Sequence, residues 1–270
     1  MSAYGYHRAG PSLDEPAFGS PEERARWHEV RRRVLGHVLA AVSESTLADS
    51  LVLRGSVLLR AWFGERAREP GDIDFVVVPP ELEARGWASH LRYELVKAVL
   101  AVPCEGVEIL TDSAEQSELW PYTDSPGMRL RMPWEADGEL RGTLQIDFSF
   151  GKRLRVGPEL SLVPVPGGAG GPREVPLYAA TPGLSLAWKV HWLLVDRSPH
   201  PKDLYDAWLL AAHVRFEPRL LGEPNLSRRK IVRRIEQLAV AADEWHEACP
   251  GAEGAPARFV RELAARLSDV

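Results

Sequence analysis

Residues 53–64 read Leu-Arg-Gly-Ser-Val-Leu-Leu-Arg-Ala-Trp-Phe-Gly, and residues 68–75 read Arg-Glu-Pro-Gly-Asp-Ile-Asp-Phe. The apolar run before Gly55 predicts a buried strand that enters a tight turn, and the run after it predicts a short helix that ends at Gly64. After a polar loop, the apolar residues from Ile73 onward predict a second strand. The order of strand, Gly-Ser turn, helix, loop and strand favours an α/β fold.

Three aspartates stand on the polar sides of the predicted strands. Asp72 and Asp74 are two residues apart on an extended chain, so their side chains point the same way. In the clearest predicted strand, residues 142–150, apolar residues alternate with polar ones and Asp147 lies on the polar side. Paired carboxylates suit Mg²⁺, and a third would let two ions sit about 3.5–4 Å apart. We therefore predict Asp72, Asp74 and Asp147 as metal ligands and catalytic residues. Asp147 would also take the proton from an attacking hydroxyl group.

The Gly-Ser turn is a candidate phosphate site. Gly55 would let the backbone approach a phosphate closely, and the helix after it would offer free N–H groups. The Ser56 hydroxyl would donate one more hydrogen bond. Each of these features alone also has an ordinary explanation, such as a solvated turn or an exposed side chain, and the prediction depends on their order along the chain.

The rest of the chain divides into a mixed first half and a helical second half. Helices are predicted over 22–50 and 81–102, and further strands over 107–110 and 128–132. The second half predicts helices over 184–195, 201–213, 227–245 and 255–267. The expected fold is an N-terminal α/β domain, a mixed sheet flanked by helices, with a helical C-terminal half. Its expected parts are a loose arm (1–21), the α/β domain (22–165), a Gly/Pro-rich linker (166–182) and a helical domain that completes the site (183–270).

Composition excludes several classes of protein. The chain has 270 residues, 45% hydrophobic and 26% charged, and a net charge of −5. These values are ordinary for a globular protein and exclude a uniformly basic nucleic-acid binder. Two cysteines without metal-ligand spacing indicate a reducing compartment, so we expect a cytoplasmic protein. Nothing in the sequence matches a membrane span or a signal peptide.

The two quoted stretches resemble the opening motif of the polymerase-β-like nucleotidyltransferases, and more narrowly that of the AbiEii type of nucleotidyltransferase toxin. A second motif agrees with this: Ala187-Trp-Lys-Val-His191, followed by Arg197 and by Pro201-Lys-Asp-Leu-Tyr-Asp-Ala207, is similar to the lysine-bearing helix and the Arg…Lys-Asp-x-x-Asp segment of that family. Pro70 stands where the family usually has Ser or Thr.

The resemblance implies roles for further residues. Lys189 would neutralise the triphosphate of an NTP as a point charge. Asp203 and Asp206 share one face of a predicted helix, and one of them would face the site and orient Lys189, without the sequence deciding which. Arg68 belongs to the first motif and would contact the nucleotide. Mg²⁺ and an NTP are thus the expected cofactor and co-substrate.

The sequence does not decide which molecule accepts the nucleotide. Basic residues cluster at 228–234 and 24–33 and would contact an RNA backbone, although such runs are commonly only solvated faces. The resemblance implies modification of the tRNA 3′ end and a cognate antitoxin as partner. Two alternatives stay open: a transferase that acts on a small molecule such as an aminoglycoside, and a degenerate relative that binds nucleotide without turnover.

Overall fold

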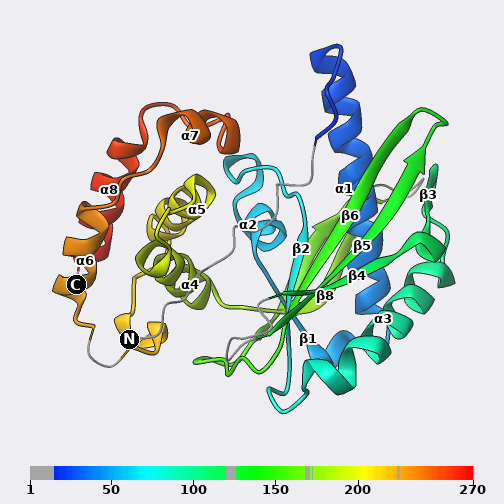
Figure 1. Ribbon diagram of the computed structural model, residues 1–270, viewed down its shortest axis with the longest axis horizontal. Coiled ribbons are helices and arrows are strands. Elements are labelled where there is room, and N and C mark those ends of the chain that lie inside the picture. Colours follow the sequence, from blue (N-terminus) through cyan, green and yellow to red (C-terminus); the bar gives the residue numbers. More distant parts are fainter. Residues whose placement is uncertain (1–14, 120–125, 168–170, 172, 224–225, 270) are drawn as a thin grey trace.

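The computed structural model describes residues 15–119, 126–167, 171, 173–223 and 226–269. Its elements in chain order are α1 (Pro21–Ser43), β1 (Leu51–Arg54), α2 (Ser56–Phe63), β2 (Ile73–Val77), α3 (Ala84–Ala101), β3 (Val107–Ile109), β4 (Glu115–Leu119), β5 (Gly127–Ala136), β6 (Leu140–Ser149), β7 (Glu159–Val165), β8 (Arg173–Ala179), α4 (Pro182–Val195), α5 (Pro201–Ala211), α6 (Arg228–Glu236), α7 (Ala242–Ala248) and α8 (Pro256–Ser268). The predicted mixed α/β class with a helical second half is confirmed (Figure 1).

One eight-stranded mixed sheet forms the centre of the first half. Its strand order is β3-β5-β6-β2-β1-β8-β7, and β4 also pairs with β5. The β1–β2 and β5–β6 pairs are antiparallel, whereas β2–β6 and β1–β8 are parallel. The two predicted strands of the opening motif are therefore neighbours at the middle of the sheet.

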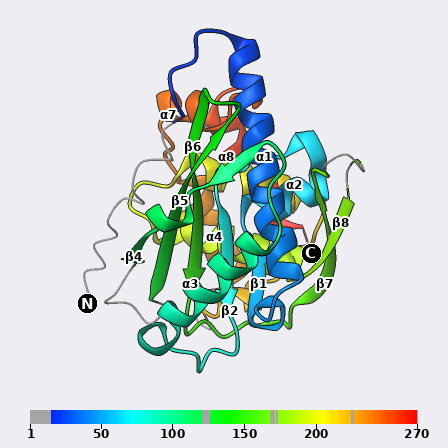
Figure 2. The same ribbon diagram turned by 90° about the vertical axis from the view of Figure 1, so that its right-hand side faces the viewer.

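Helices α1 and α3 cover one face of this sheet, and the helical half lies on the other side (Figures 1 and 2). Alternate residues of β2, namely Ile73, Phe75 and Val77, are buried in one hydrophobic core with residues of α1 and α3. Because successive side chains of a strand point to opposite faces, Asp74 points toward the helical half.

A second hydrophobic core holds the helical half together. It is formed mainly by residues of α4, α5, α6 and α8, together with Phe216 and Trp245. The short helix α2 contributes residues to both cores, since Val57 and Leu58 are buried in the first core and Leu59 is buried in the second. The turn that precedes α2 is thereby fixed between the two halves.

Part of the predicted linker is a strand. Residues 173–179 form β8, which pairs with both β1 and β7. Val175, Leu177 and Ala179 are buried, whereas the residues between them are exposed, which is the ordinary pattern of a half-buried strand. The many glycines and prolines around this stretch hid the alternation. The division into domains itself stays a prediction.

Two predicted helices are shorter than expected. The helix predicted over 22–50 ends at Ser43, and a separate turn follows at residues 48–50. The helix predicted over 227–245 is wrong as a single element, because α6 ends at Glu236 and α7 begins at Ala242. Between them Leu238 and Val240 pack against the second core from a non-helical segment.

The predicted arm is only partly described. Residues 1–14 lie outside the described residues. Phe18 packs against the first core, with its ring centroid 5.6 Å from that of Trp27. The Ser20 hydroxyl accepts a hydrogen bond from the backbone N–H of Glu23 and so caps α1. No helix in the described parts of the chain combines the length and apolar character that crossing a membrane requires.

Candidate active site

The turn between β1 and α2 lies directly against Asp74. Gly55 has φ 79° and ψ −156°, a conformation that side chains with a Cβ rarely adopt. A Cβ added at this position would overlap the carboxylate of Asp74. Ser56 is buried, and its Oγ has no hydrogen-bond partner within the described residues. The turn therefore places the N-terminus of α2 and an unengaged hydroxyl beside the site.

Four charged residues form a row across the middle of the sheet. In the strand register Arg54 lies opposite Asp74, Asp74 opposite Asp147, and Asp147 opposite Arg129. Partners in register carry their side chains on the same face of a sheet. Two carboxylates from distant parts of the chain are thus side by side, with an arginine at each end of the row.

The two carboxylates of this row have different partners. Arg129 donates to both oxygens of Asp147, at 2.8 and 2.7 Å, so that carboxylate is fully held. Asp74 has one longer contact, 3.5 Å from the Arg54 guanidinium. Burial raises the pKa of Asp74 to about 6, and the nearby charge of Asp72 adds to this rise while Arg54 opposes it. Of the two carboxylates in this row, Asp74 is therefore the one whose negative charge is less compensated by nearby positive charge.

A second cluster comes from α4, α5 and the loop before β2. The Nζ of Lys189 lies 2.8 Å from a carboxylate oxygen of Asp203 and 2.8 Å from one of Asp206. Arg68 donates to both oxygens of Asp206, each at 3.1 Å. Both aspartates thus contact Lys189, and which of them faces the site stays a prediction.

Charge pairing in this cluster outweighs the cost of burial. Burial alone would raise the pKa of Asp206, but Arg68 and Lys189 lower it below its ordinary value. Burial likewise opposes the charged form of Lys189, yet Asp203 and Asp206 raise its pKa above the usual range. Asp206 and Lys189 therefore stay ionised at neutral pH.

The carboxylates suit a divalent cation unequally. Within the described residues, no three His, Cys, Asp or Glu side chains come together in a way that could hold a metal ion. Asp72 and Asp74 have the oxygens best suited to such an ion, since Asp74 is poorly compensated and Asp72 lies close enough to raise its pKa. Both oxygens of Asp147 accept hydrogen bonds from Arg129.

Most of the predicted basic cluster on α1 is engaged inside the protein. Arg26 pairs with Asp137 at 2.9 Å, Arg32 pairs with Glu69 at 3.1 Å, and Arg33 donates to the backbone oxygen of Glu105. The guanidinium of Arg31 is buried and stacks 4.6 Å from the Trp27 ring centroid.

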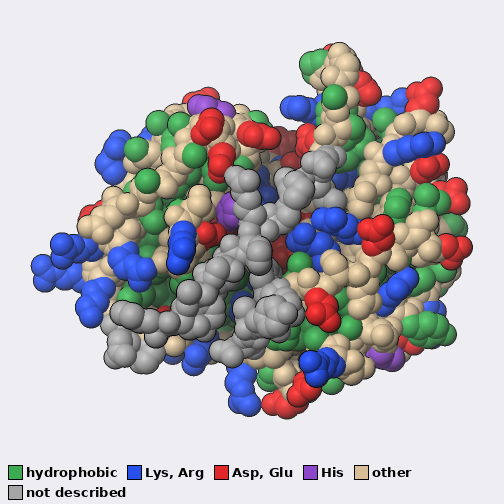
Figure 3. Space-filling model, in the orientation of Figure 1, with side chains coloured by type: hydrophobic (Ala, Val, Ile, Leu, Met, Phe, Trp, Pro, Cys, Tyr) green, Lys and Arg blue, Asp and Glu red, His purple; other side chains and the backbone are tan. Residues whose placement is uncertain are grey.

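The cluster on α6 is different, because part of it faces solvent. Arg228 and Arg234 donate to backbone oxygens and stabilise the helical half. Arg229, Lys230 and Arg233 are exposed, and none forms an ion pair with any described residue. Blue side chains gather at the edge of the molecule in Figure 3 where α6 lies in Figure 1.

Sequence reasoning missed the two arginines of the row. Arg54 stands inside the quoted motif, one residue before Gly55, and its position at the end of a strand was the available signal. Arg129 had no local signal, because its role follows from pairing with Asp147 across two strands.

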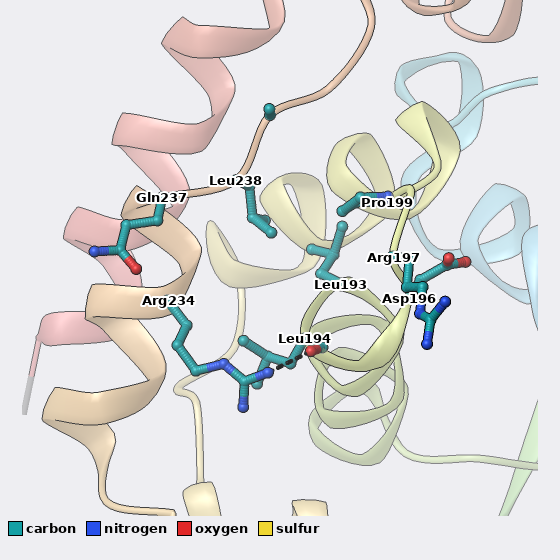
Figure 4. A pocket seen from close by; sticks show the side chains of 9 residues that line it. Leu193, Leu194, Asp196, Arg197, Pro199, Arg234, Gln237 and Leu238 are labelled. Atoms are coloured by element: carbon teal, nitrogen blue, oxygen red, sulfur yellow. Dashed lines mark hydrogen bonds between the residues drawn. The ribbon is translucent and has the colours of Figure 1, made fainter. Parts of the chain in front are cut away.

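A cavity of about 320 Å³ lies at the end of α4 and is lined by residues that include Leu193, Arg197 and Arg234 (Figure 4). None of the predicted site residues lines it.

Comparisons with known proteins found one matching family and similar solved structures. The sequence profile of the family described as nucleotidyl transferase AbiEii toxin, type IV toxin–antitoxin system, matches residues 37–254. A solved structure of MenT4, a nucleotidyltransferase toxin from Mycobacterium tuberculosis H37Rv, is similar in fold, with a TM-score of 0.57 and 17% identity over 91% of this chain and 85% of that one.

A nucleotidyltransferase-like protein from Paracoccidioides brasiliensis, an antigen, aligns over 82% of this chain and 98% of that one, with a TM-score of 0.40 and 14% identity. Among curated proteins there is no match.

Proposed function

The chain belongs to the family of AbiEii nucleotidyl transferase toxins, and from this premise we propose that it transfers a nucleoside monophosphate from an NTP to the 3′ end of a tRNA. The observation that carries the proposal is the position of Asp74. It lies between the Gly55 turn and Asp147, on the face of the sheet that meets the helical half. Nucleotidyl transfer needs carboxylates next to a phosphate-binding turn, and the contact of Asp74 with the Gly55 turn supports that role.

The donor side of the proposed site is the turn and the cluster on the helices. We propose that the phosphates of the NTP lie along Gly55 and Ser56, where backbone N–H groups and the unengaged Ser56 hydroxyl are available. Lys189 and Arg68 lie on the far side of the proposed site. Asp203 and Asp206 hold Lys189, and Asp206 holds Arg68, so the four charges balance and the cluster offers a fixed wall with little freedom to move.

Asp72 and Asp74 are our proposed ligands for Mg²⁺. When bound, the ion would polarise the phosphate and help a hydroxyl to attack at neutral pH. Asp147 is the proposed third carboxylate of the site. Since Arg129 donates to both of its oxygens, a role for Asp147 as metal ligand or proton acceptor requires Arg129 to release one of them.

The reaction itself is a displacement at phosphorus. The acceptor hydroxyl oxygen forms a bond to the α-phosphorus of the NTP, and the bond from that phosphorus to the bridging oxygen of the β-phosphate breaks. Pyrophosphate leaves with the electron pair of the broken bond. The hydroxyl proton passes to a site carboxylate, for which Asp147 is our proposal.

The exposed face of α6 supports a polyanionic acceptor. Arg229, Lys230 and Arg233 are exposed and form no ion pair with the residues that the structure describes, so their positive charge attracts an RNA backbone and repels a cationic aminoglycoside. Membership of the family further implies a cognate antitoxin as partner. We also propose a cytoplasmic location, where NTPs and tRNA are found and where the two free cysteines would stay reduced.

Labelling of RNA by the purified protein tests this proposal. The protein is incubated with Mg²⁺, total tRNA and each of the four α-labelled NTPs in turn, and with an aminoglycoside in place of RNA. We expect one NTP to label tRNA and Asp72→Ala to abolish the labelling. Asp243→Ala, an exposed aspartate on α7, is the matched control and should keep full activity.

Each other outcome identifies an alternative. Pyrophosphate release that depends on the aminoglycoside would replace the RNA acceptor with a small molecule. NTP binding without release of pyrophosphate under any condition would indicate a member that has lost turnover. Labelling that persists in Asp72→Ala would contradict the assignment of the site.

A further inference from the structure

The lysine expected to neutralise the triphosphate is already neutralised by the protein. Lys189 lies 2.8 Å from oxygens of both Asp203 and Asp206, and Asp206 is almost completely buried. An ammonium with two carboxylate partners has little remaining attraction for a phosphate, because the cluster as a whole carries no large excess of positive charge. A phosphate in this site would therefore need another cation that can respond to it.

Lys152 is such a cation. It lies in the segment just after β6, the strand that carries Asp147, and its Nζ is 4.6 Å from the centroid of the Trp188 ring. Arg54 lies over the same ring, with its guanidinium carbon at 5.7 Å. Trp188 precedes Lys189 on α4, so the aromatic ring brings these two cations to the junction between the sheet and the helical half.

Lys152 has no carboxylate within ion-pair distance in the part of the chain that the structure describes. The charges that act on it are those of Arg54 and, less strongly, Asp74, while its own charge acts on His191 of α4. Burial, with Arg54, lowers the pKa of Lys152 to about 7. A poorly solvated ammonium without a counter-charge is costly, and an anionic ligand would remove that cost.

Two further hydrogen-bond donors near Asp74 are unmet. Arg54 uses one guanidinium nitrogen on Asp74 and Ser149, while its buried Nε has no partner among the described residues. The Oγ of Ser56, two residues along the chain, is also buried and unpaired. Buried donors in folded proteins are nearly always satisfied, so several unmet donors around one carboxylate indicate a site for an acceptor-rich ligand.

We propose that Lys152, together with Arg54 and Ser56, binds the phosphate chain of the nucleotide substrate, while Lys189 keeps Asp203, Asp206 and Arg68 in position. This inference rests on the proposed function, since it assigns the residue that recognises the polyphosphate of the NTP. The ligand chemistry is a linear polyphosphate next to a divalent cation. The assignment makes Lys152 a substrate-binding residue and Lys189 a positioning residue.

Calorimetric titration with inorganic tripolyphosphate in the presence of Mg²⁺ tests the proposal, because this probe needs no knowledge of the base. Lys152→Met keeps an apolar stem over Trp188 and removes only the ammonium. We expect it to weaken tripolyphosphate binding by roughly 10- to 100-fold, the usual range for losing a hydrogen bond to a charged group. Lys152→Arg should restore most of the affinity.

The matched control is Arg153→Met, which removes a positive charge from the next residue. The Arg153 side chain is 83% exposed and, among the described residues, pairs with Glu81 alone at 3.5 Å, so the affinity should not change. Thermal unfolding should show Lys152→Met to be at least as stable as the wild type, because the substitution removes a desolvated charge. This separates loss of binding from loss of fold.

A second readout separates substrate contact from a structural effect. The ratio of the affinities for NTP and NMP should fall in Lys152→Met, whereas general disturbance of the site would weaken both nucleotides alike. Equal tripolyphosphate affinities of wild type and Lys152→Met would overturn the inference, even if the wild type labels tRNA. Polyphosphate binding that depends on Lys152, in a protein that labels no RNA, would instead support the inference and contradict the proposed acceptor.

Discussion

The helical side and the sheet side of the site differ in how their charged side chains are paired. On the helical side Lys189, Arg68, Asp203 and Asp206 are bonded to one another at 2.8 to 3.3 Å. On the sheet side Asp74 has one long contact to Arg54, and Lys152 has no carboxylate partner among the described residues. The Asp206 side chain is 1% exposed and that of Asp74 is 23% exposed, so the two sides differ in depth of burial as well as in pairing.

This difference indicates where stability and activity are located. A paired buried cluster loses much stability when one partner is removed, because the others are left uncompensated. Charges that are uncompensated in the free protein are instead available to a substrate, and removing them relieves electrostatic repulsion. We therefore expect substitutions on the helical side to lower mainly the stability of the fold, and substitutions on the sheet side to lower mainly turnover.

Asp206→Asn should give the largest effect on stability. It leaves Lys189 with one carboxylate and Arg68 with none among its present partners, so we expect a loss of about 3–5 kcal/mol in the free energy of unfolding. Urea denaturation measures this loss. Asp203→Asn is the matched control and should cost less, because the bonds of Asp206 to both cations remain. A loss below about 1 kcal/mol for Asp206→Asn would show that the cluster does not stabilise the fold.

The same variant should change the acid sensitivity of the protein. The pKa of Asp206 is lowered in the folded state, so its contribution is present above its ordinary value of 3.8 and is lost as the pH falls below that value. The wild type should therefore lose stability more steeply than Asp206→Asn in this acid range. Parallel curves for the two proteins would contradict the pKa shift.

Asp74→Asn should abolish turnover with little effect on folding. Loss of a proposed metal ligand should reduce labelling by more than about 100-fold, since even outer partners of a metal site are worth 10- to 100-fold. The free energy of unfolding should stay equal or rise, because the amide removes repulsion from Asp72 and Asp147. Asp243→Asn controls for general effects of the change. An unfolded variant would show that Asp74, like the helical cluster, contributes mainly to folding.

Gly55→Ala tests the contact between the turn and Asp74. Gly55 and Gly64 both have positive φ, at 79° and 57°, but a Cβ at Gly64 would meet no atom within 4 Å. Each alanine should cost about 1–3 kcal/mol in backbone strain. Only Gly55→Ala should also displace the Asp74 carboxylate and lower labelling, by about 10-fold or more. Equal activity of the two variants would show that the turn does not position Asp74.

The exposed face of α6 should give the smallest effect. Changing Arg229, Lys230 and Arg233 to Gln should lower the slope of log affinity for tRNA against log salt by about 2 to 3. A control with equal loss of charge changes Arg24, Arg26 and Arg32 of α1, which have carboxylate partners within the protein. The two variants should differ, and equal slopes would mean that α6 does not bind RNA.

Local patterns in the sequence predicted the parts of the fold that depend on neighbouring residues. The strand ending at Arg54, the Gly55 turn, α2 and β2 were all predicted from a single stretch, because propensity and turn chemistry act over a few residues. Strand β4 was not predicted, since four of its five residues are polar. Strand β8 was hidden by the glycines and prolines on either side of it.

The sequence alone determined which charged residues are neighbours along the chain: Asp72 and Asp74 stand two residues apart at the start of β2, and Asp203 and Asp206 stand three apart on α5. Only the tertiary structure decided which charges are paired. Arg129 holds Asp147 through strand register, and Arg68 holds Asp206 across 138 residues. Electrostatic pairing depends on distances of a few ångströms in space, which helix packing and strand register set and which separation along the chain does not encode.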